Sequence, residues 1–339
     1  MPSHGRLCRA ARGSAGPLCY SLPVANEAQF EEPIQRVRRR LEELKSFADS
    51  PARDREVEKL EEKLRKLSRE IYENLTPWQK TLVARHPNRP FTLDYVRILI
   101  RDFVEWHGDR SFADDPAIVA GFGFLGERAV AVIGHQKGRD TREKIRRNFG
   151  MPRPEGYRKA LRVMKLAEKF GKPVLSFIDT PGAFPGLESE ERGVAEAIAR
   201  NLLEMSALRV PIVATVIGEG GSGGALGIGI GDVILMLEHS VYSVISPEGC
   251  AAILWKDQAR AQEAAEAMRL TAADCKALGV IEEVLPEPPG GAHADPVATI
   301  DTVGRAIDER LERLARLSVE TLLEARYAKF RAMGAWENA

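Results

Sequence analysis

The sequence predicts an α/β protein in which strands and helices alternate, with further helices at both ends of the chain. Three observations lead to this prediction. Short apolar runs of strand length recur along the middle of the chain, amphipathic segments separate them, and glycine- or proline-rich turns follow several of the runs. At 339 residues, the chain is long enough for one large domain and an appendage.

Residues 1–28 precede the first segment with a regular pattern. The stretch 1–25 contains Arg6, Arg9 and Arg12 and no acidic residue. This composition is similar to that of an organellar transit peptide, which is rich in arginine and poor in acids. We expect a disordered tail over 1–28, with a transit peptide as the alternative.

Residues 29–80 have the pattern of a helical hairpin. Apolar residues recur three or four positions apart over 34–44 and again over 57–71. Pro51 lies between the two stripes and marks the start of a second helix. Two amphipathic helices joined by a turn predict an antiparallel pair. Such a pair is either an interaction arm that packs on another subunit or a cap folded onto its own domain.

Residues 81–339 are expected to form the main domain. Apolar runs predict strands at 117–124, 129–134, 174–178, 212–217, 233–237 and 241–245. Amphipathic segments predict helices at 154–170 and 190–208, a helix that begins near Gly224, and a helical tail over 297–333. Strands that alternate with helices at this spacing favour β-α-β units.

The overall composition excludes several classes of protein. Lys plus Arg and Asp plus Glu both number 49, so no net charge attracts nucleic acid or an anionic membrane. The longest apolar runs are too short to span a bilayer. The four cysteines, at positions 8, 19, 250 and 275, are scattered and supply no complete set of zinc ligands. We therefore expect no metal in this chain and a reducing compartment.

The segment 218–226 (GEGGSGGAL) has the pattern with the most chemical content. A strand that ends in glycines and restarts as a helix places the free N–H groups of the helix start beside a ligand, which suits a phosphate or an oxyanion. A phosphate-binding P-loop would need a lysine that is absent here, and a dinucleotide fingerprint lacks a clearly placed acid. Gly220, Ser222 and Gly224 also fit the G-x-S-x-G nucleophile elbow. Tight packing alone is the remaining interpretation.

Two further segments are candidates for substrate contact. The segment 179–186 (DTPGAFPG) follows a predicted buried strand, and its two Pro-Gly pairs indicate a rigid loop at the edge where ligands bind in open α/β sheets. The segment 134–147 is basic, with Lys137 and Arg139 at its start and Lys144, Arg146 and Arg147 at its end. Such a cluster either holds the phosphates of a nucleotide-bearing substrate or is a solvated loop.

Together these motifs resemble the alpha subunit of bacterial and plastid acetyl-CoA carboxylase carboxyltransferase. The resemblance runs from about residue 30 to the C-terminus and depends on long, ordered motifs. They lie at 135–139 (HQKGR), 146–152 (RRNFGMP), 154–160 (PEGYRKA), 179–186, 218–226, 245–251 (ISPEGCA) and 264–286.

The resemblance implies a crotonase-like fold, which is a spiral of βα repeats, and an α2β2 assembly with a beta subunit that carries a four-cysteine zinc ribbon. It also implies an ATP-dependent complex with a biotin carboxyl carrier protein and biotin carboxylase. This complex makes malonyl-CoA in the first committed step of fatty acid synthesis. Carboxybiotin and acetyl-CoA are then substrates, no cofactor is bound permanently, and the expected location is the bacterial cytoplasm, with the plastid as the alternative.

The same resemblance implies roles for particular residues. Backbone N–H groups of Gly223 and Gly224 stabilise the ureido oxygen of biotin, and the biotin anion takes the proton from the acetyl group, so no protein base is required. The residues expected to contact substrate are Gly220, Gly221, Ser222, Gly182, Ala183, Lys137 and Arg139.

Three other functions remain open from the residues alone. A crotonase-type hydratase or isomerase would use a carboxylate such as Glu219 or Glu248. A serine peptidase would use Ser222 with His239 or His293. A scaffold for the beta subunit would need no chemistry at the glycines.

Overall fold

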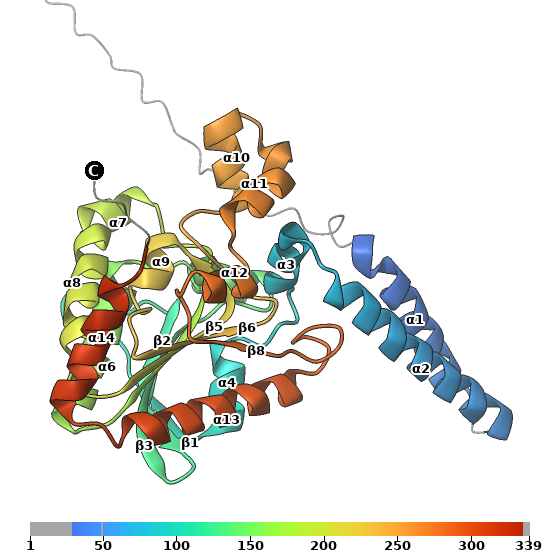
Figure 1. The fold of residues 1–339 in the computed structure, drawn as a ribbon, viewed down its shortest axis with the longest axis horizontal. Helices are drawn as coiled ribbons and strands as arrows, with labels where there is room; N and C mark the ends of the chain where they lie inside the picture. The colour runs from blue at the N-terminus through green and yellow to red at the C-terminus, as the bar shows by residue number, and fades with distance from the viewer. Residues whose placement is uncertain (1–28, 49, 335–339) are drawn as a thin grey trace, which may run out of the picture.

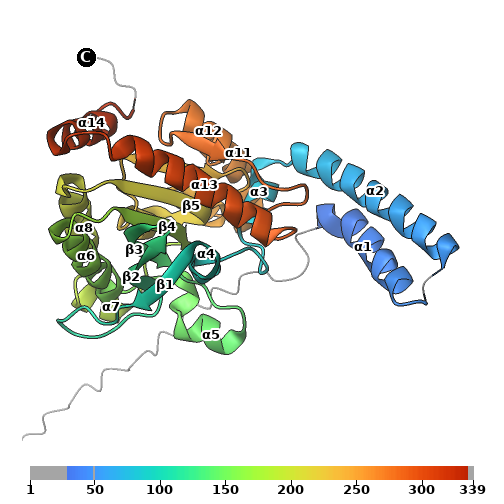
Figure 2. The same cartoon turned by 90° about the horizontal axis from the view of Figure 1, so that it is seen from below.

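The computed structural model describes residues 29–48 and 50–334, so the tail predicted over 1–28 and its transit-peptide alternative lie outside the described residues. Figures 1 and 2 show a body built around one sheet and a two-helix arm that extends from its side. Within the described part of the chain, no helix combines the length and the apolar composition needed to cross a membrane.

An eight-stranded mixed sheet forms the centre of the body, and its order is β1-β2-β3-β4-β5-β6-β8, with β7 paired to β5. The first three strands are antiparallel neighbours, and all pairs from β3 onward are parallel. The strands are β1 (Ile100–Glu105), β2 (Ile118–Leu125), β3 (Arg128–His135), β4 (Val174–Thr180), β5 (Ile212–Gly221), β6 (Val233–Leu237), β7 (Val241–Ser243) and β8 (Glu283–Leu285).

Helices cover both faces of this sheet, and the side chains of successive strand residues point to opposite faces. Val130 and Val132 of β3 pack with helices α4 and α13, whereas Ala131 and Ile133 pack with helix α6. The helices on the first face are α4 (Thr92–Leu99) and α13 (Pro296–Leu314). Those on the second face are α6 (Pro154–Lys169), α8 (Val194–Ala207), α12 (Ala272–Ala277) and α14 (Val319–Arg331).

The arm consists of α1 (Glu32–Lys45) and α2 (Pro51–Glu73), which pack on each other. Its base meets the body where Ile34 and Tyr72 contact Val83 of α3 (Pro77–Ala84), and its outer part projects away (Figures 1 and 2). The predicted hairpin is confirmed, and its outer part does not fold back on the body (Figures 1 and 2). Its role as an arm that packs on another subunit stays a prediction. The boundary predicted at residue 80 falls inside α3, which packs on the body.

The remaining short helices lie in the connections between these elements, except η1, which directly precedes α1 of the arm. They are η1 (Gln29–Glu31), α5 (Thr141–Arg146), η2 (Asn148–Gly150), α7 (Leu187–Glu191), α9 (Ser222–Leu226), α10 (Pro247–Trp255), η3 (Gln258–Arg260) and α11 (Ala261–Met268). All six predicted strands are present, and the run 233–237 matches β6 to the residue. Strand β1 was not predicted, because its sequence is largely charged and three of its six residues are exposed.

Candidate active site

The glycine-rich segment forms the junction between β5 and α9. Gly221 is the last residue of β5 and the N-cap of α9, and no side chain caps the helix. Ser222, Gly223 and Gly224 therefore occupy the first turn, where backbone N–H groups have no partner within the helix. The predicted transition from strand to helix is confirmed, and it begins two residues earlier than expected.

The loop after β4 lies directly against this first turn. Because β4 and β5 are parallel neighbours, their following loops emerge at the same edge of the sheet. A Cβ atom on Gly221 would lie 2.2 Å from the carbonyl oxygen of Pro181, and one on Gly224 would lie 2.4 Å from the carbonyl carbon of Gly182. Only glycine permits backbones this close. The contact brings the N–H group of Ala183 next to the first turn of α9.

The two segments therefore bring together seven of the nine predicted site residues. Five come from the β5–α9 junction and two from the loop after β4. They are Gly220, Gly221, Ser222, Gly223, Gly224, Gly182 and Ala183.

Ser222 has an unusual backbone conformation, with φ of 49°. A side-chain-bearing residue in this left-handed region stores strain of about 1–3 kcal/mol, which is typical of functional sites.

A nucleophilic serine would also need a base. Within residues 29–48 and 50–334, no histidine is hydrogen-bonded to Ser222, and His239 and His293 lie at the base of the arm. The geometry does not support a serine peptidase.

A chain of buried charges lies beneath the glycine-rich junction. The Nζ atom of Lys137 is 2.7 Å from Asp179 and 2.8 Å from Glu219, and Arg85 Nε is 2.7 Å from Glu219. Arg85 also reaches Glu248 at the start of α10, at 2.5 Å. The Oδ1 atom of Asp179 accepts a hydrogen bond from the backbone N–H of Glu219 at 3.0 Å. This chain of charged side chains therefore holds the end of β5 in place.

These charges determine the ionisation of Glu219. Burial alone would raise the pKa of Glu219, but the positive charges of Lys137 and Arg85 lower it to about 2. A general base for a hydratase works best with a pKa near the operating pH. Glu219 therefore stays ionised, and Glu248 forms an ion pair with Arg85.

The two basic residues predicted to contact substrate are both bonded within the protein. Lys137 is a member of the buried charge chain. Arg139 donates to the carbonyl oxygens of Pro87 and Arg89, pairs with Asp94, and lies 4.0 Å from the centre of the Phe91 ring. Contact between these two side chains and a substrate stays a prediction, and the observed bonds give both of them a structural role.

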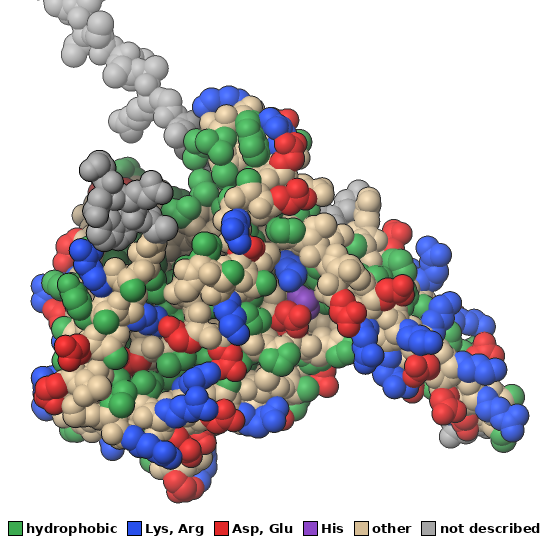
Figure 3. Space-filling view, viewed as in Figure 1, with side chains coloured by type: hydrophobic (Ala, Val, Ile, Leu, Met, Phe, Trp, Pro, Cys, Tyr) green, Lys and Arg blue, Asp and Glu red, His purple; other side chains and the backbone are tan. Residues whose placement is uncertain are grey.

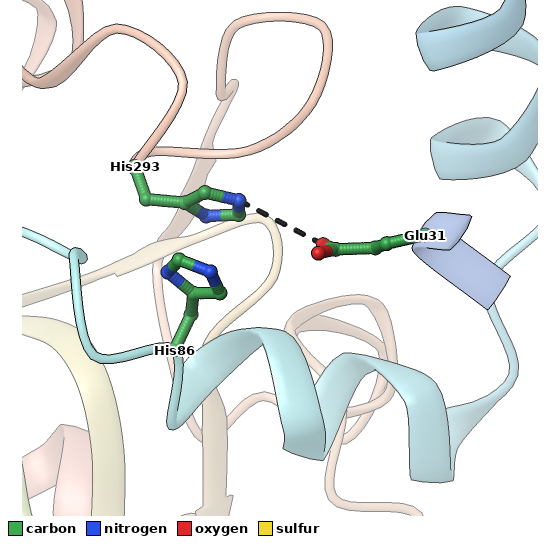
Figure 4. A group of neighbouring side chains, drawn as sticks. All are labelled: Glu31, His86 and His293. Carbon is green, nitrogen blue, oxygen red and sulfur yellow. Dashed lines mark ion pairs between the residues drawn. The ribbon is translucent and has the colours of Figure 1, made fainter. Parts of the chain in front are cut away.

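A second polar cluster joins the arm to the body (Figure 4). Glu31, His86 and His293 offer ligand atoms within 4.8 Å of one another, and the Tyr72 hydroxyl donates to Glu31. The two imidazole rings are stacked, with centroids 3.7 Å apart, so in-plane coordination of one cation would require them to turn apart. The Nδ1 atom of His86 already accepts the N–H of Asn88 at 3.2 Å. These contacts favour a hydrogen-bonded anchor for the arm over a metal centre.

Comparison with solved structures defines the class of fold. Transcarboxylase 12S, solved with methylmalonyl-coenzyme A bound, is similar with a TM-score of 0.55 at 18% identity; the match covers 68% of this chain and 44% of the other. A Pseudomonas malonate decarboxylase hetero-tetramer, solved with coenzyme A, is similar with a TM-score of 0.53 at 16% identity over 64% of this chain and 89% of the other. The chain shares the fold of these two proteins, and the predicted crotonase-like fold is confirmed.

Comparison of sequences defines the family. A family model described as acetyl co-enzyme A carboxylase carboxyltransferase-like matches residues 27–334. A relative from Syntrophotalea carbinolica is 58% identical over 90% of this chain and 96% of its own length. Another, from Stenotrophomonas maltophilia, is 54% identical over 93% of this chain and 99% of its own. Both are named acetyl-coenzyme A carboxylase carboxyl transferase subunit alpha. The chain belongs to this alpha-subunit family, which confirms the resemblance inferred from its motifs.

Proposed function

We propose that this chain is the alpha half of an acetyl-CoA carboxyltransferase. With a beta subunit, it transfers the carboxyl group of carboxybiotin, held on a carrier protein, to acetyl-CoA and so makes malonyl-CoA. The observation that carries this proposal is the close approach of two loops: the first turn of α9 lies against the Gly182–Ala183 backbone, and both present N–H groups at the carboxyl edge of the sheet.

Carboxybiotin supplies a carboxyl group whose release leaves negative charge on the ureido oxygen. The backbone N–H groups of Gly223 and Gly224, with that of Ala183 beside them, would stabilise this charge. Removal of one such donor typically costs about 2.7–4 kcal/mol of transition-state stabilisation. Because backbone groups hold the oxygen and the released biotin anion accepts the proton, the proposal requires no acid or base from this chain.

The surface near this edge supports a partner that covers the site. Apolar side chains are exposed here on several elements, and they gather over α10 and α11 in the upper part of Figure 3. Exposed apolar groups in one region mark protein interfaces. The exposed residues are Leu187 of α7, Leu226 of α9, Val244 before α10, and Ile253 and Leu254 of α10.

We propose that the beta subunit, with its zinc ribbon, binds over this region and supplies the site for the acetyl-CoA enolate. The biotin carboxyl carrier protein and biotin carboxylase would complete the ATP-dependent complex of fatty acid synthesis. We place that complex in the cytoplasm of a bacterium, in keeping with the bacterial sources of the relatives.

The test is the reverse reaction, in which malonyl-CoA carboxylates free biocytin. It is measured with this chain alone, with a beta subunit alone, and with the two co-purified. We expect activity only in the mixture. A complex that forms and stays inactive would refute the proposed substrates, whereas activity of this chain alone on an unsaturated acyl-CoA would favour a hydratase.

A further inference from the structure

The carbonyl oxygen of Gly224 is held by two buried side chains that the proposed function does not use. The Nε2 atom of His135, at the end of β3, lies 3.2 Å from this oxygen. The hydroxyl group of Tyr157, in α6, donates to the same oxygen at 3.4 Å. Both side chains are fully buried. The two contacts converge on the turn that carries the proposed oxyanion hole.

The hydrogen-bond pattern fixes the proton on the His135 ring. The backbone N–H of Asp179 points at Nδ1 at 3.4 Å, so Nδ1 accepts and the neutral ring carries its proton on Nε2. Burial lowers the pKa of His135 to about 3. The ring is therefore a neutral donor to Gly224 at physiological pH, and the same residue connects the end of β4 to the start of α9.

The start of α9 needs such external support. The helix has five residues, and its second and third residues are glycines, whose backbone has more freedom than that of any other residue. The N–H groups of Gly227 and Ile228 bond to the carbonyl oxygens of Gly223 and Ala225, which leaves the Gly224 oxygen to the two side chains. The Tyr157 ring also packs against the helix, because a Cβ atom on Gly227 would lie 2.5 Å from it.

We propose that His135 and Tyr157 are positioning residues for carboxyl transfer: by holding the Gly224 carbonyl, they orient the first-turn N–H groups of α9 toward the oxygen of biotin. Neither touches the reacting atoms, and neither exchanges a proton during the reaction. The inference rests on the proposed function and adds the groups that determine the geometry of its oxyanion hole.

Two substitutions at position 135 separate the hydrogen bond from packing. In His135→Gln, the side-chain NH2 group reaches the position of Nε2 and can still donate to Gly224. In His135→Asn, the amide ends near the position of Nδ1, so it can accept from Asp179 but does not reach Gly224. Tyr157→Phe removes one oxygen atom and keeps the ring. Each variant is purified with the beta subunit, and complex formation and thermal stability are compared with those of the wild type.

The readout is kcat and KM for malonyl-CoA in the biocytin reaction. A displacement of about 1 Å at a reacting centre can cost 100-fold in rate, so we expect kcat to fall about 10- to 100-fold in His135→Asn and less in Tyr157→Phe. The KM should change by less than about twofold, because malonyl-CoA binding does not depend on the hole for biotin. His135→Gln should recover most of kcat, with a pH profile like that of the wild type.

The inference is overturned if both His135→Asn and Tyr157→Phe keep the wild-type kcat. It is also overturned if His135→Gln forms the complex and is as slow as His135→Asn, because packing or ionisation would then explain the loss. A rise in KM at constant kcat would indicate a binding role instead. An inactive wild-type complex would refute the proposed function itself, and the positioning role with it.

Discussion

Gly224→Ala tests the contact between the two loops most directly. A Cβ atom at this position would lie 2.4 Å from the Gly182 carbonyl carbon and 2.5 Å from the Ala183 nitrogen. Ordinary contacts begin at 3.4 Å, so the backbones must separate by about 1 Å. Neither atom belongs to a flexible side chain that could turn away. We expect the added methyl group to cost about 1–3 kcal/mol of stability through overpacking.

The same displacement moves the N–H group of Ala183 away from those of α9. A shift of about 1 Å in a catalytic geometry can cost 100-fold, so kcat of the biocytin reaction should fall by about two orders of magnitude. The free energy of unfolding of this chain and kcat of the complex are measured side by side.

Gly223→Ala is the matched control, since it makes the same substitution one residue away. Its Cβ atom would lie 3.5 Å from the Ile198 side chain, which is an ordinary contact, and the N–H group is kept. Alanine also favours helix over glycine by about 1 kcal/mol, so stability should not fall. If Gly224→Ala is as stable and as active as Gly223→Ala, the backbone contact does not define the site.

Three other outcomes follow from the buried groups. Lys137→Met leaves Asp179 and Glu219 buried without a shared cation, so the free energy of unfolding measured in urea should fall by about 3–5 kcal/mol. An unchanged urea midpoint would contradict the stabilising role of this chain of charges. The folded-state pKa of His135, about 3, lies below its unfolded value near 6.5, so the contribution of this residue to stability should be constant above pH 6.5 and fall by up to about 1.4 kcal/mol per pH unit below it; a His135→Gln variant should therefore lose less stability on acidification than the wild type. Tyr72→Phe removes the donor to Glu31, so limited proteolysis of the arm should become faster while the body stays resistant; equal cleavage rates would refute the anchor.

The sequence was sufficient to predict both loops of the site because each has a local signal. The glycines at 220–224 and the Pro-Gly pairs at 181–186 follow apolar runs, and parallel strands place such loops at one edge. Sequence did not reveal that the two backbones touch at Gly221 and Gly224. That contact depends on β4 and β5 being neighbours in the sheet, which is a property of topology rather than of either segment.

The members of the charge chain had no local signal. Arg85 lies 134 residues before Glu219 and 163 before Glu248. The pattern around Lys137 indicated a basic cluster, but a pattern does not show whether a charge faces water or a buried carboxylate. His135 and Tyr157 lie within motifs that carried the family resemblance, and only the structure shows that both side chains reach Gly224.

A site made of glycine backbone groups lacks rigidity of its own, and the buried charges supply it. Glycines allow the loops to approach, but each glycine in a regular element costs about 0.5–1 kcal/mol and holds its own conformation poorly. The carboxylate of Asp179 takes the space that a side chain on Gly218 would fill, since a Cβ atom there would lie 2.4 Å from Oδ1. The same carboxylate bonds to the Glu219 N–H and to Lys137. Rigidity at the junction therefore comes from these buried side chains, and the first-turn N–H groups stay available for the oxyanion that we propose they bind.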